Sequence, residues 1–276
     1  MNARRLLAFD LDKTVLTADY ELPAVIERAV KLAQAQGHVV TVLTGRPIGA
    51  AQEYVDQLGV EGPFSVNHGG VIYRRRGEVL RRRNLATGTV QQLLEPYLPI
   101  ADLDFSCIVD ETLYVRDPED IRWAWAHTQN RRVLRYDPAT PLAADKVVFA
   151  ADPRTERLQD EIRERNEDLI TYLWGDGYLE VMAPGADKGT ALEKISRKLG
   201  FAREDTIAFG DGLNDVTMLA WAGHGVAVGD TAHPDTVQVA DERIPEPELG
   251  GVAGWLEANL GIRVDAQAEE PVGEGA

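Results

Sequence analysis

Residues 6–14 read LLAFDLDKT, an apolar run that leads directly into two aspartates, Asp10 and Asp12. The run predicts a buried strand over residues 6–11, and residues two apart in an extended segment point the same way. In an open parallel sheet, reactive groups lie beyond the carboxyl ends of the strands. We therefore expect the carboxylates of Asp10 and Asp12 to face one shared ligand at a strand end.

Two such carboxylates need a charge partner. Held about 4 Å apart, they repel by roughly 4 kcal/mol at an effective dielectric constant near 20. The pair must share a proton or recruit a cation, and Mg²⁺ is a hard cation that prefers oxygen ligands. The alternative interpretation is that Asp10 and Asp12 only open a loop or cap the next helix, and residues further along the chain argue against it.

Strand and helix patterns alternate at both ends of the chain. Before residue 85 we expect strands at 6–11, 39–43 and 64–66 and helices at 23–36 and from 47 to 58. After residue 184 we expect helices at 188–199, from Asp215 and at 252–260, and strands at 206–210 and 225–228. This alternation predicts an α/β fold with a doubly wound, Rossmann-like parallel sheet as its core.

The pattern changes between residues 85 and 184. Short strands at 112–115, 146–150 and 178–182 mix with helices near 87–97 and 155–165, which predicts an inserted α+β domain. The expected domains are thus residues 1–84 and 185–264 for the core and 85–184 for the insertion. Residues 265–276 are too polar to fold alone and are expected to form a disordered acidic tail. Trp123, Trp125 and Trp174 are expected to pack in the core or at a domain interface, with a substrate platform as the alternative.

Composition excludes several classes of protein. The net charge of −16 over 276 residues argues against general nucleic-acid binding. No stretch approaches the ~18 apolar residues of a membrane span, and we expect neither a secretion signal nor a membrane segment. Cys107 is the only cysteine, so no intramolecular disulfide can form, which fits a cytoplasmic protein and an inert core thiol.

Residues 74–83, RRRGEVLRRR, place six arginines around a glycine turn and predict a basic hairpin. One interpretation is a solvated hairpin whose arginines pair with this protein's surplus carboxylates. The other is a docking patch for an anion or a partner, and the sequence leaves both open.

Four separated segments fall at a strand end or a helix start. They are Asp10-x-Asp12-x-Thr14, Thr44-Gly45-Arg46, DKGT at 187–190 and GDGLND at 210–215. In order and spacing they resemble the haloacid dehalogenase superfamily of phosphotransferases, over residues 5 to about 260. The insertion between Thr44 and Lys188 is similar to a C2-type cap, so the resemblance is to the Cof-like, subclass IIB sugar-phosphatase branch.

The resemblance implies a division of labour among acidic residues. Asp10 would attack phosphorus and form an aspartyl phosphate, which splits one difficult step into two. Asp12 would protonate the leaving alcohol and later deprotonate water, while only its backbone carbonyl would bind Mg²⁺. Asp10 and Asp211 would be further metal ligands, and Asp215 either joins them or holds a metal-bound water.

Further residues would bind the phosphoryl group. Thr44 and the amide of Gly45 would donate hydrogen bonds to its oxygens, and Lys188 would supply a fixed positive charge. Asn214 would orient these groups or contact phosphate. Arg46 is a candidate for anion or hydroxyl recognition, and Asn67 opens a segment that faces the substrate in the Cof-like branch.

Two positions depart from the family pattern. Lys13 stands where this branch usually has a glycine for a tight turn, which leaves the turn geometry and a contact with the cap open. His68 stands in Asn67-His68-Gly69-Gly70, where the branch usually reads Asn-Gly-Ala. As a lone histidine, His68 is either structural or a substrate contact.

The sequence thus predicts a Mg²⁺-dependent phosphatase acting on a small phosphate ester, most plausibly of a sugar or polyol. It predicts no nucleic-acid or membrane partner, and a monomer or homodimer. One alternative is a sugar phosphomutase, which would need a second phosphate clamp of cap arginines; candidates are Arg116, Arg122, Arg131, Arg132 and Arg135. The other is a catalytically silent scaffold or regulatory protein. No motif in this sequence identifies the ester.

Overall fold

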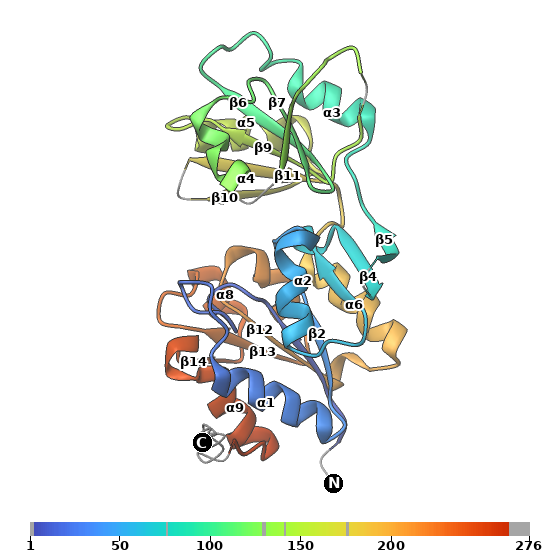
Figure 1. Ribbon diagram of the computed structural model, residues 1–276, viewed down its shortest axis with the longest axis vertical. Helices are drawn as coiled ribbons and strands as arrows, with labels where there is room; N and C mark the ends of the chain where they lie inside the picture. The colour runs from blue at the N-terminus through green and yellow to red at the C-terminus, as the bar shows by residue number, and fades with distance from the viewer. Residues whose placement is uncertain (1–2, 76, 129–130, 141, 175–176, 265–276) are drawn as a thin grey trace, which may run out of the picture.

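The computed structural model describes residues 3–264, apart from residues 76, 129, 130, 141, 175 and 176. The chain forms two domains that lie one above the other in Figure 1, connected by the segments between β5 and α3 and between β11 and α6. The lower domain, the core, contains the first and the last described segments of the chain, and the upper domain, the cap, is formed by its middle. The predicted tail at 265–276 lies outside the described residues.

The core is built on a five-stranded parallel sheet in the order β14-β13-β12-β1-β2. Its strands are β1 Leu6–Phe9, β2 Val39–Val42, β12 Thr206–Gly210, β13 His224–Val228 and β14 Glu242–Ile244. β1 is central, with β2 on one side and β12 on the other. The order of strands reverses at β1, and the crevice beyond its carboxyl end is where such sheets bind ligands.

Helices cover both faces of this sheet, which is why β1 is apolar throughout. Leu7 and Phe9 pack against α1 Ala24–Ala35, α2 Ile48–Gln57 and α9 Gly251–Leu260. Leu6 and Ala8 pack on the opposite face against α6 Lys188–Leu199 and α7 Val216–Trp221, beside the short α8 Pro234–Val239. None of the described helices is long and apolar enough to cross a membrane.

A three-stranded antiparallel sheet joins the core to the cap. It consists of β3 Phe64–Val66, β4 Val71–Arg75 and β5 Glu78–Arg82, and β3 meets the end of β2 through a bridge between Leu43 and Ser65. β4 and β5 form the predicted basic hairpin. Arg74 and Arg75 pair with Glu78, and Arg82 binds Asp110 and Asp145 of the cap at 2.6 and 2.9 Å. These contacts fit the interpretation in which the arginines pair with carboxylates.

The cap contains a six-stranded sheet in the order β10-β11-β9-β6-β7-β8, antiparallel except for the β7–β8 pair. Its strands are β6 Asp104–Val109, β7 Thr112–Val115, β8 Arg132–Arg135, β9 Lys146–Ala150, β10 Ile170–Trp174 and β11 Tyr178–Met182. α3 Thr87–Leu94 and α5 Thr155–Arg165 cover one face, where Cys107 is buried and burial raises the pKa of its thiol to about 12.

The other face of the cap sheet is covered only in part, by the short α4 Ala124–Thr128 and the turn before it. Trp123 is fully buried there and its indole N–H donates to Asp104, as predicted for core packing. Because side chains alternate along β9, Val147 and Phe149 face α3 and α5, whereas Lys146 and Val148 face the other way, toward the core. The roof of the site is therefore the open face of the cap sheet.

The elements that we expected are present in the structure, but several further strands and helices were missed. β1 ends at Phe9, not at residue 11, because the carbonyl of Leu11 accepts turn hydrogen bonds from the next residues. The strands β6, β8, β10 and β14 and the helices α4 and α8 were not predicted; β8 and β14 are short and carry exposed charges. The boundaries expected at residues 85 and 184 stay a prediction.

Candidate active site

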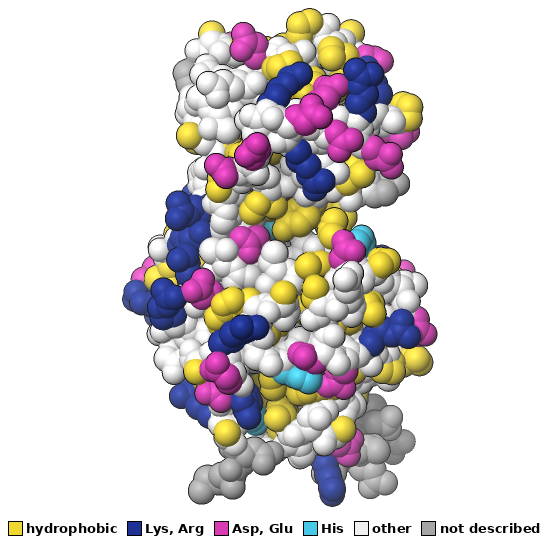
Figure 2. Space-filling view, turned by 180° about the vertical axis from the view of Figure 1, so that it is seen from behind, with side chains coloured by type: hydrophobic (Ala, Val, Ile, Leu, Met, Phe, Trp, Pro, Cys, Tyr) yellow, Lys and Arg dark blue, Asp and Glu magenta, His cyan; other side chains and the backbone are white. Residues whose placement is uncertain are grey.

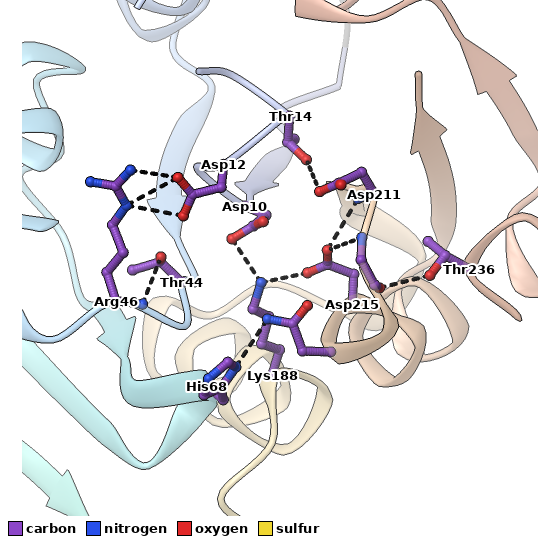
Figure 3. A network of polar contacts seen from close by, with 12 residues as sticks. Asp10, Asp12, Thr14, Thr44, Arg46, His68, Lys188, Asp211, Asp215 and Thr236 are labelled. Atoms are coloured by element: carbon purple, nitrogen blue, oxygen red, sulfur yellow. Dashed lines mark hydrogen bonds and ion pairs between the residues drawn. The ribbon is translucent and has the colours of Figure 1, made fainter. Parts of the chain in front are cut away.

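The acidic residues converge where β1 and β12 end side by side (Figure 3). Asp10 follows β1, Asp211 follows β12, and Asp215 closes a 3₁₀ turn, Leu213–Asp215, that begins just after β12. The carboxylate of Asp215 accepts the backbone N–H groups of Asp211 and Gly212 at 3.1 and 2.9 Å. The turn thereby fixes Asp215 against the end of β12 and beside Asp10.

Lys188 places one cation among these carboxylates. Its side chain is fully buried, and Nζ lies 2.7 Å from Asp10 Oδ1 and 2.6 Å from Asp215 Oδ1. α6 begins at Lys188, and the N-cap residue Asp187 accepts the N–H of Thr190 at 2.8 Å, which fixes this end of the helix. Burial alone would lower the pKa of Lys188, but Asp10 and Asp215 hold it above its usual range. Lys188 is thus a fixed positive charge.

The same carboxylates can hold a metal ion. Asp10, Asp211 and Asp215 each offer one oxygen, and these oxygens lie within 4.8 Å of one another. Burial raises the pKa of Asp10 well above its usual value, opposed by Lys188 and reinforced by the neighbouring carboxylates. Burial and Asp215 likewise raise the pKa of Asp211 to about 7. Three carboxyl groups around one ammonium offer hard oxygen donors, and a cation that binds them would displace the protons that the raised pKa values favour, which fits Mg²⁺.

Asp10 and Asp12 line the same inner cavity, but their carboxylates contact different cations, and a shared ligand stays a prediction. The chain turns after β1, and the carboxylate of Asp12 binds the guanidinium of Arg46, with Nε to Oδ2 at 3.0 Å. The Arg46 guanidinium also lies over the rings of Tyr20 and Tyr54, 5.0 and 4.9 Å from their centroids. Although burial opposes it, the bond to Asp12 raises the pKa of Arg46. Arg46 is therefore engaged with Asp12, and a metal contact through the Asp12 backbone stays a prediction.

The Thr44 loop lies next to this pair. Thr44 is buried, its hydroxyl accepts the N–H of Arg46 at 3.1 Å, and it does not cap α2, whose N-cap is Pro47. Gly45 lines the cavity above Asp10, and a Cβ there would collide with the imidazole of His68, so only glycine fits. Asn67 is buried nearby, and its side-chain oxygen has no hydrogen-bond partner within the described chain.

His68 connects the core to the cap. Its Nδ1 lies 3.0 Å from Nδ2 of Asn214, an atom that can only donate, so Nδ1 accepts and Nε2 carries the proton. Nε2 lies 2.7 Å from Glu180 on β11, whose other oxygen accepts from Lys146 on β9 at 2.6 Å. Burial lowers the pKa of His68, whereas Lys146 and His68 hold the pKa of Glu180 below its usual range against the effect of burial. We name Asn214, His68, Glu180 and Lys146 the interdomain relay.

Two adjoining cavities lie between the domains. The inner one, of about 330 Å³, is lined by Asp10, Asp211, Asn214 and Gly45, and the outer one, of about 720 Å³, opens between the cap sheet and α2. Residues that line both are Asp12, Lys13, Arg46, Lys146, Trp174 and Glu180. The inner cavity is bounded by Asp10 and Asp211, and the outer one leads away from them under the cap.

Sequence reasoning did not single out Lys146 and Glu180, and it left His68 open. The two cap residues belong to no motif, since each stands on an ordinary strand and only the sheet register brings them together. Lys13 has a φ of +54°, the left-handed conformation for which glycine is the usual residue. Trp125 and Trp174 line the outer cavity, and Trp174 also packs near His68, 6.0 Å between ring centroids.

A doubly wound parallel core whose switch point is roofed by an inserted α+β domain, with acidic residues at the strand ends, is typical of capped hydrolases with a Rossmann-like sheet. The chain belongs to the haloacid dehalogenase-like hydrolases, because the model of that family matches residues 7–256. It is a phosphatase of the Cof type, and its cap is similar in fold to that of a subclass IIB phosphatase.

Known proteins place the chain within this family. It is 31% identical over 232 residues to the HMP-PP phosphatase of Serratia proteamaculans. The aligned region covers 82% of this chain and 84% of that protein. It is 24% identical to the 5-amino-6-(5-phospho-D-ribitylamino)uracil phosphatase YcsE of Bacillus subtilis, covering 91% and 96%. The structure of the subclass IIB sugar phosphatase BT4131 superposes with a TM-score of 0.79 at 21% identity, covering 94% and 100%, and supports the fold.

Proposed function

We propose that this chain is a Mg²⁺-dependent phosphomonoester hydrolase that acts on a small sugar or polyol phosphate through an aspartyl phosphate on Asp10. The observation that carries the proposal is the buried contact of Lys188 with Asp10 and Asp215 beside Asp211. One strand end thus combines a nucleophile, a fixed cation and hard oxygen ligands. Two relatives support the substrate class, since one is named for a phosphoribityl compound and one as a sugar phosphatase.

In the first step, an oxygen of Asp10 attacks phosphorus, and the bond from phosphorus to the leaving oxygen breaks. The leaving oxygen takes a proton from Asp12, so the contact between Asp12 and Arg46 loosens when the ester enters. In the second step, Asp12 takes a proton from water, and the hydroxyl attacks phosphorus, which releases phosphate and restores Asp10.

The other residues bind and orient the phosphoryl group. Lys188 would balance charge on its oxygens, and the amide of Gly45, which lines the inner cavity, and the hydroxyl of the buried Thr44 next to it would donate hydrogen bonds. Mg²⁺, held by Asp10, Asp211 and Asp215, would offset the negative charge that an anionic substrate brings to an already acidic site.

No observation favours a phosphomutase. Of the five cap arginines considered for a second phosphate clamp, Arg131 alone lines the cavities described above. Arg116 donates to the carbonyls of Tyr97 and Leu98, and Arg122 and Arg135 pair with Asp120 and Asp117. These arginines stabilise the cap itself.

The test is phosphate release from a panel of sugar and polyol monophosphates with Mg²⁺ or with EDTA. The native chain is expected to release phosphate only with Mg²⁺, and Asp10→Asn is expected to lower the rate by on the order of 10⁴-fold or more. Acid-quenched native enzyme should carry a phosphoryl group that Asp10→Asn lacks. Turnover by Asp10→Asn at the native rate would exclude the mechanism.

A further inference from the structure

The wall of the outer cavity is aromatic where the cap forms it. Trp174 and Tyr178 are directly opposite each other in the β10–β11 ladder, so their side chains leave the sheet on the same face. Trp125 on α4 lines the same cavity. We propose that these three residues, the ring platform, bind a planar heterocycle at the far end of the phosphorylated polyol or sugar chain. The proposal rests on the proposed phosphatase function and specifies its substrate class.

Contacts with other residues hold the three side chains of the ring platform in place. The Tyr178 hydroxyl donates to the carbonyl of Arg122 at 2.8 Å, and the guanidinium of Arg131 lies 5.7 Å from the ring centroid of Trp125. Trp174 packs against Tyr172, with ring centroids 6.2 Å apart. Because these rings are already ordered, binding a ligand to them costs little additional side-chain entropy.

Between the ring platform and Asp10, the lining is polar. Lys146 and Glu180 line both cavities, and Lys146 uses one of its three N–H groups on Glu180. An ammonium and a carboxylate side by side can bind the hydroxyl groups of a polyol or sugar chain. The order of surfaces from Asp10 outward is therefore phosphate site, hydroxyl site and aromatic site.

The size of the cavity agrees with this order. The outer cavity has a volume of about 720 Å³, which is within the range typical of sites for drug-sized ligands. The inner cavity provides further space next to it. A bare sugar or polyol phosphate would reach Lys146 and Glu180 and leave the aromatic wall facing water. On the face drawn in Figure 2, hydrophobic side chains gather at the waist between the two domains.

Two relatives combine the same chemical parts in one molecule. YcsE and YitU of Bacillus subtilis, 24% and 28% identical to this chain, are both named for a uracil that carries a phosphoribityl chain. A planar ring, a polyol and a terminal phosphate would occupy the three surfaces in that order. The alternative role of the aromatic residues is packing of cap against core, which would give no preference for a ring.

The experiment measures binding to the full-length Asp10→Asn variant with Mg²⁺ by titration calorimetry, so that turnover does not interfere. Uridine 5′-monophosphate is compared with ribose 5-phosphate, which has the same phosphorylated sugar without a ring, and flavin mononucleotide with ribitol 5-phosphate. Stacking on aromatic side chains is worth ~1–3 kcal/mol per base. We expect the ring to lower the dissociation constant at least about 10-fold in one or both pairs.

Substitutions then locate the effect. Trp174→Leu should reduce the ratio of the two dissociation constants to below about threefold, Trp174→Phe should retain most of it, and Trp221→Leu, on α7 in the core, should not change it. Equal affinity for both members of each pair, no binding of either ring-bearing ester, or an unchanged ratio in Trp174→Leu would overturn the ring platform. Absence of phosphate release by the native chain, with ring-dependent binding retained, would instead overturn only the phosphatase proposal.

Discussion

The two sides of the active site balance their charges differently. On the core side, three acidic groups, Asp10, Asp211 and Asp215, lie around the ammonium of Lys188. On the cap side, Glu180 lies between the ammonium of Lys146 and the neutral ring of His68, and one negative charge meets one positive charge. We therefore expect a cation from outside the chain to bind on the core side, whereas on the cap side the contacts between the two domains balance the charges within the chain.

The largest effect on stability is expected on the core side, when the cation Lys188 is removed. Lys188→Met would leave Asp10 and Asp215 buried without their cation, and breaking a buried pair in this way costs ~3–5 kcal/mol. Urea unfolding in the absence of Mg²⁺ measures this loss. Lys194→Met, an exposed position on the same helix, is the control and should stay within about 0.5 kcal/mol of the native chain.

The double variant Lys188→Met with Asp10→Asn separates charge from packing. It should recover part of the stability lost in Lys188→Met, because one of the uncompensated carboxylates is gone. If the double variant is no more stable than the single one, the loss came from packing, and the view of the core side as a charge cluster is wrong.

The same contrast explains what the sequence could predict. Core residues such as Asp10 and Asp211 follow buried strands and stand in short motifs, so the order of strands brings them together. Lys146 and Glu180 are 34 positions apart on two cap strands, and only the pairing of β9 with β11 makes them neighbours. No local pattern encodes that register, and β10, which completes the aromatic wall, was not predicted as a strand.

The next largest effect is expected from a metal ion bound on the core side. Mg²⁺ at about 100 times its dissociation constant should raise the free energy of unfolding by ~2.7 kcal/mol, because it binds the folded state only. Differential scanning fluorimetry with Mg²⁺ and with EDTA measures this shift. Asp211→Asn should remove most of it, and Asp168→Asn, an exposed cap carboxylate, should leave it intact. An equal shift in Asp211→Asn would mean that the metal binds elsewhere.

On the cap side, Glu180→Gln tests whether the interdomain relay holds the domains closed. The variant removes the charged partner of Lys146 and weakens the bond to His68, at a cost of ~1–3 kcal/mol. When the cap opens, water can hydrate Lys146 and His68, so the variant should favour the open state. Small-angle X-ray scattering should then give a larger radius of gyration. Glu167→Gln, exposed in the cap, serves as the control. An unchanged radius and unchanged stability would show that other contacts close the cap.

The interdomain relay also gives closure a pH dependence. Burial holds the pKa of His68 below its usual 6.5 when the cap is closed, although Glu180 opposes this and Lys146 and Lys188 reinforce it. An open or unfolded His68 takes up a proton near pH 6.5, and the closed state does so only at lower pH. Closure is therefore expected to weaken as pH falls below 6.5. His68→Gln should lose this component between pH 7 and 5 in the same scattering experiment, while a native chain that stays closed at pH 5 would contradict it.

The smallest expected effect is a gain in stability on the core side. Lys13 has a φ of +54°, and a non-glycine residue in that conformation costs about 1 kcal/mol. Lys13→Gly should relieve this strain and raise the melting temperature by ~2–4 °C. Lys13→Ala is the matched variant, because it removes the same charge near Asp211 but keeps a Cβ in the left-handed conformation. If glycine and alanine have equal melting temperatures, the charge of Lys13 and not its backbone decides stability at this turn.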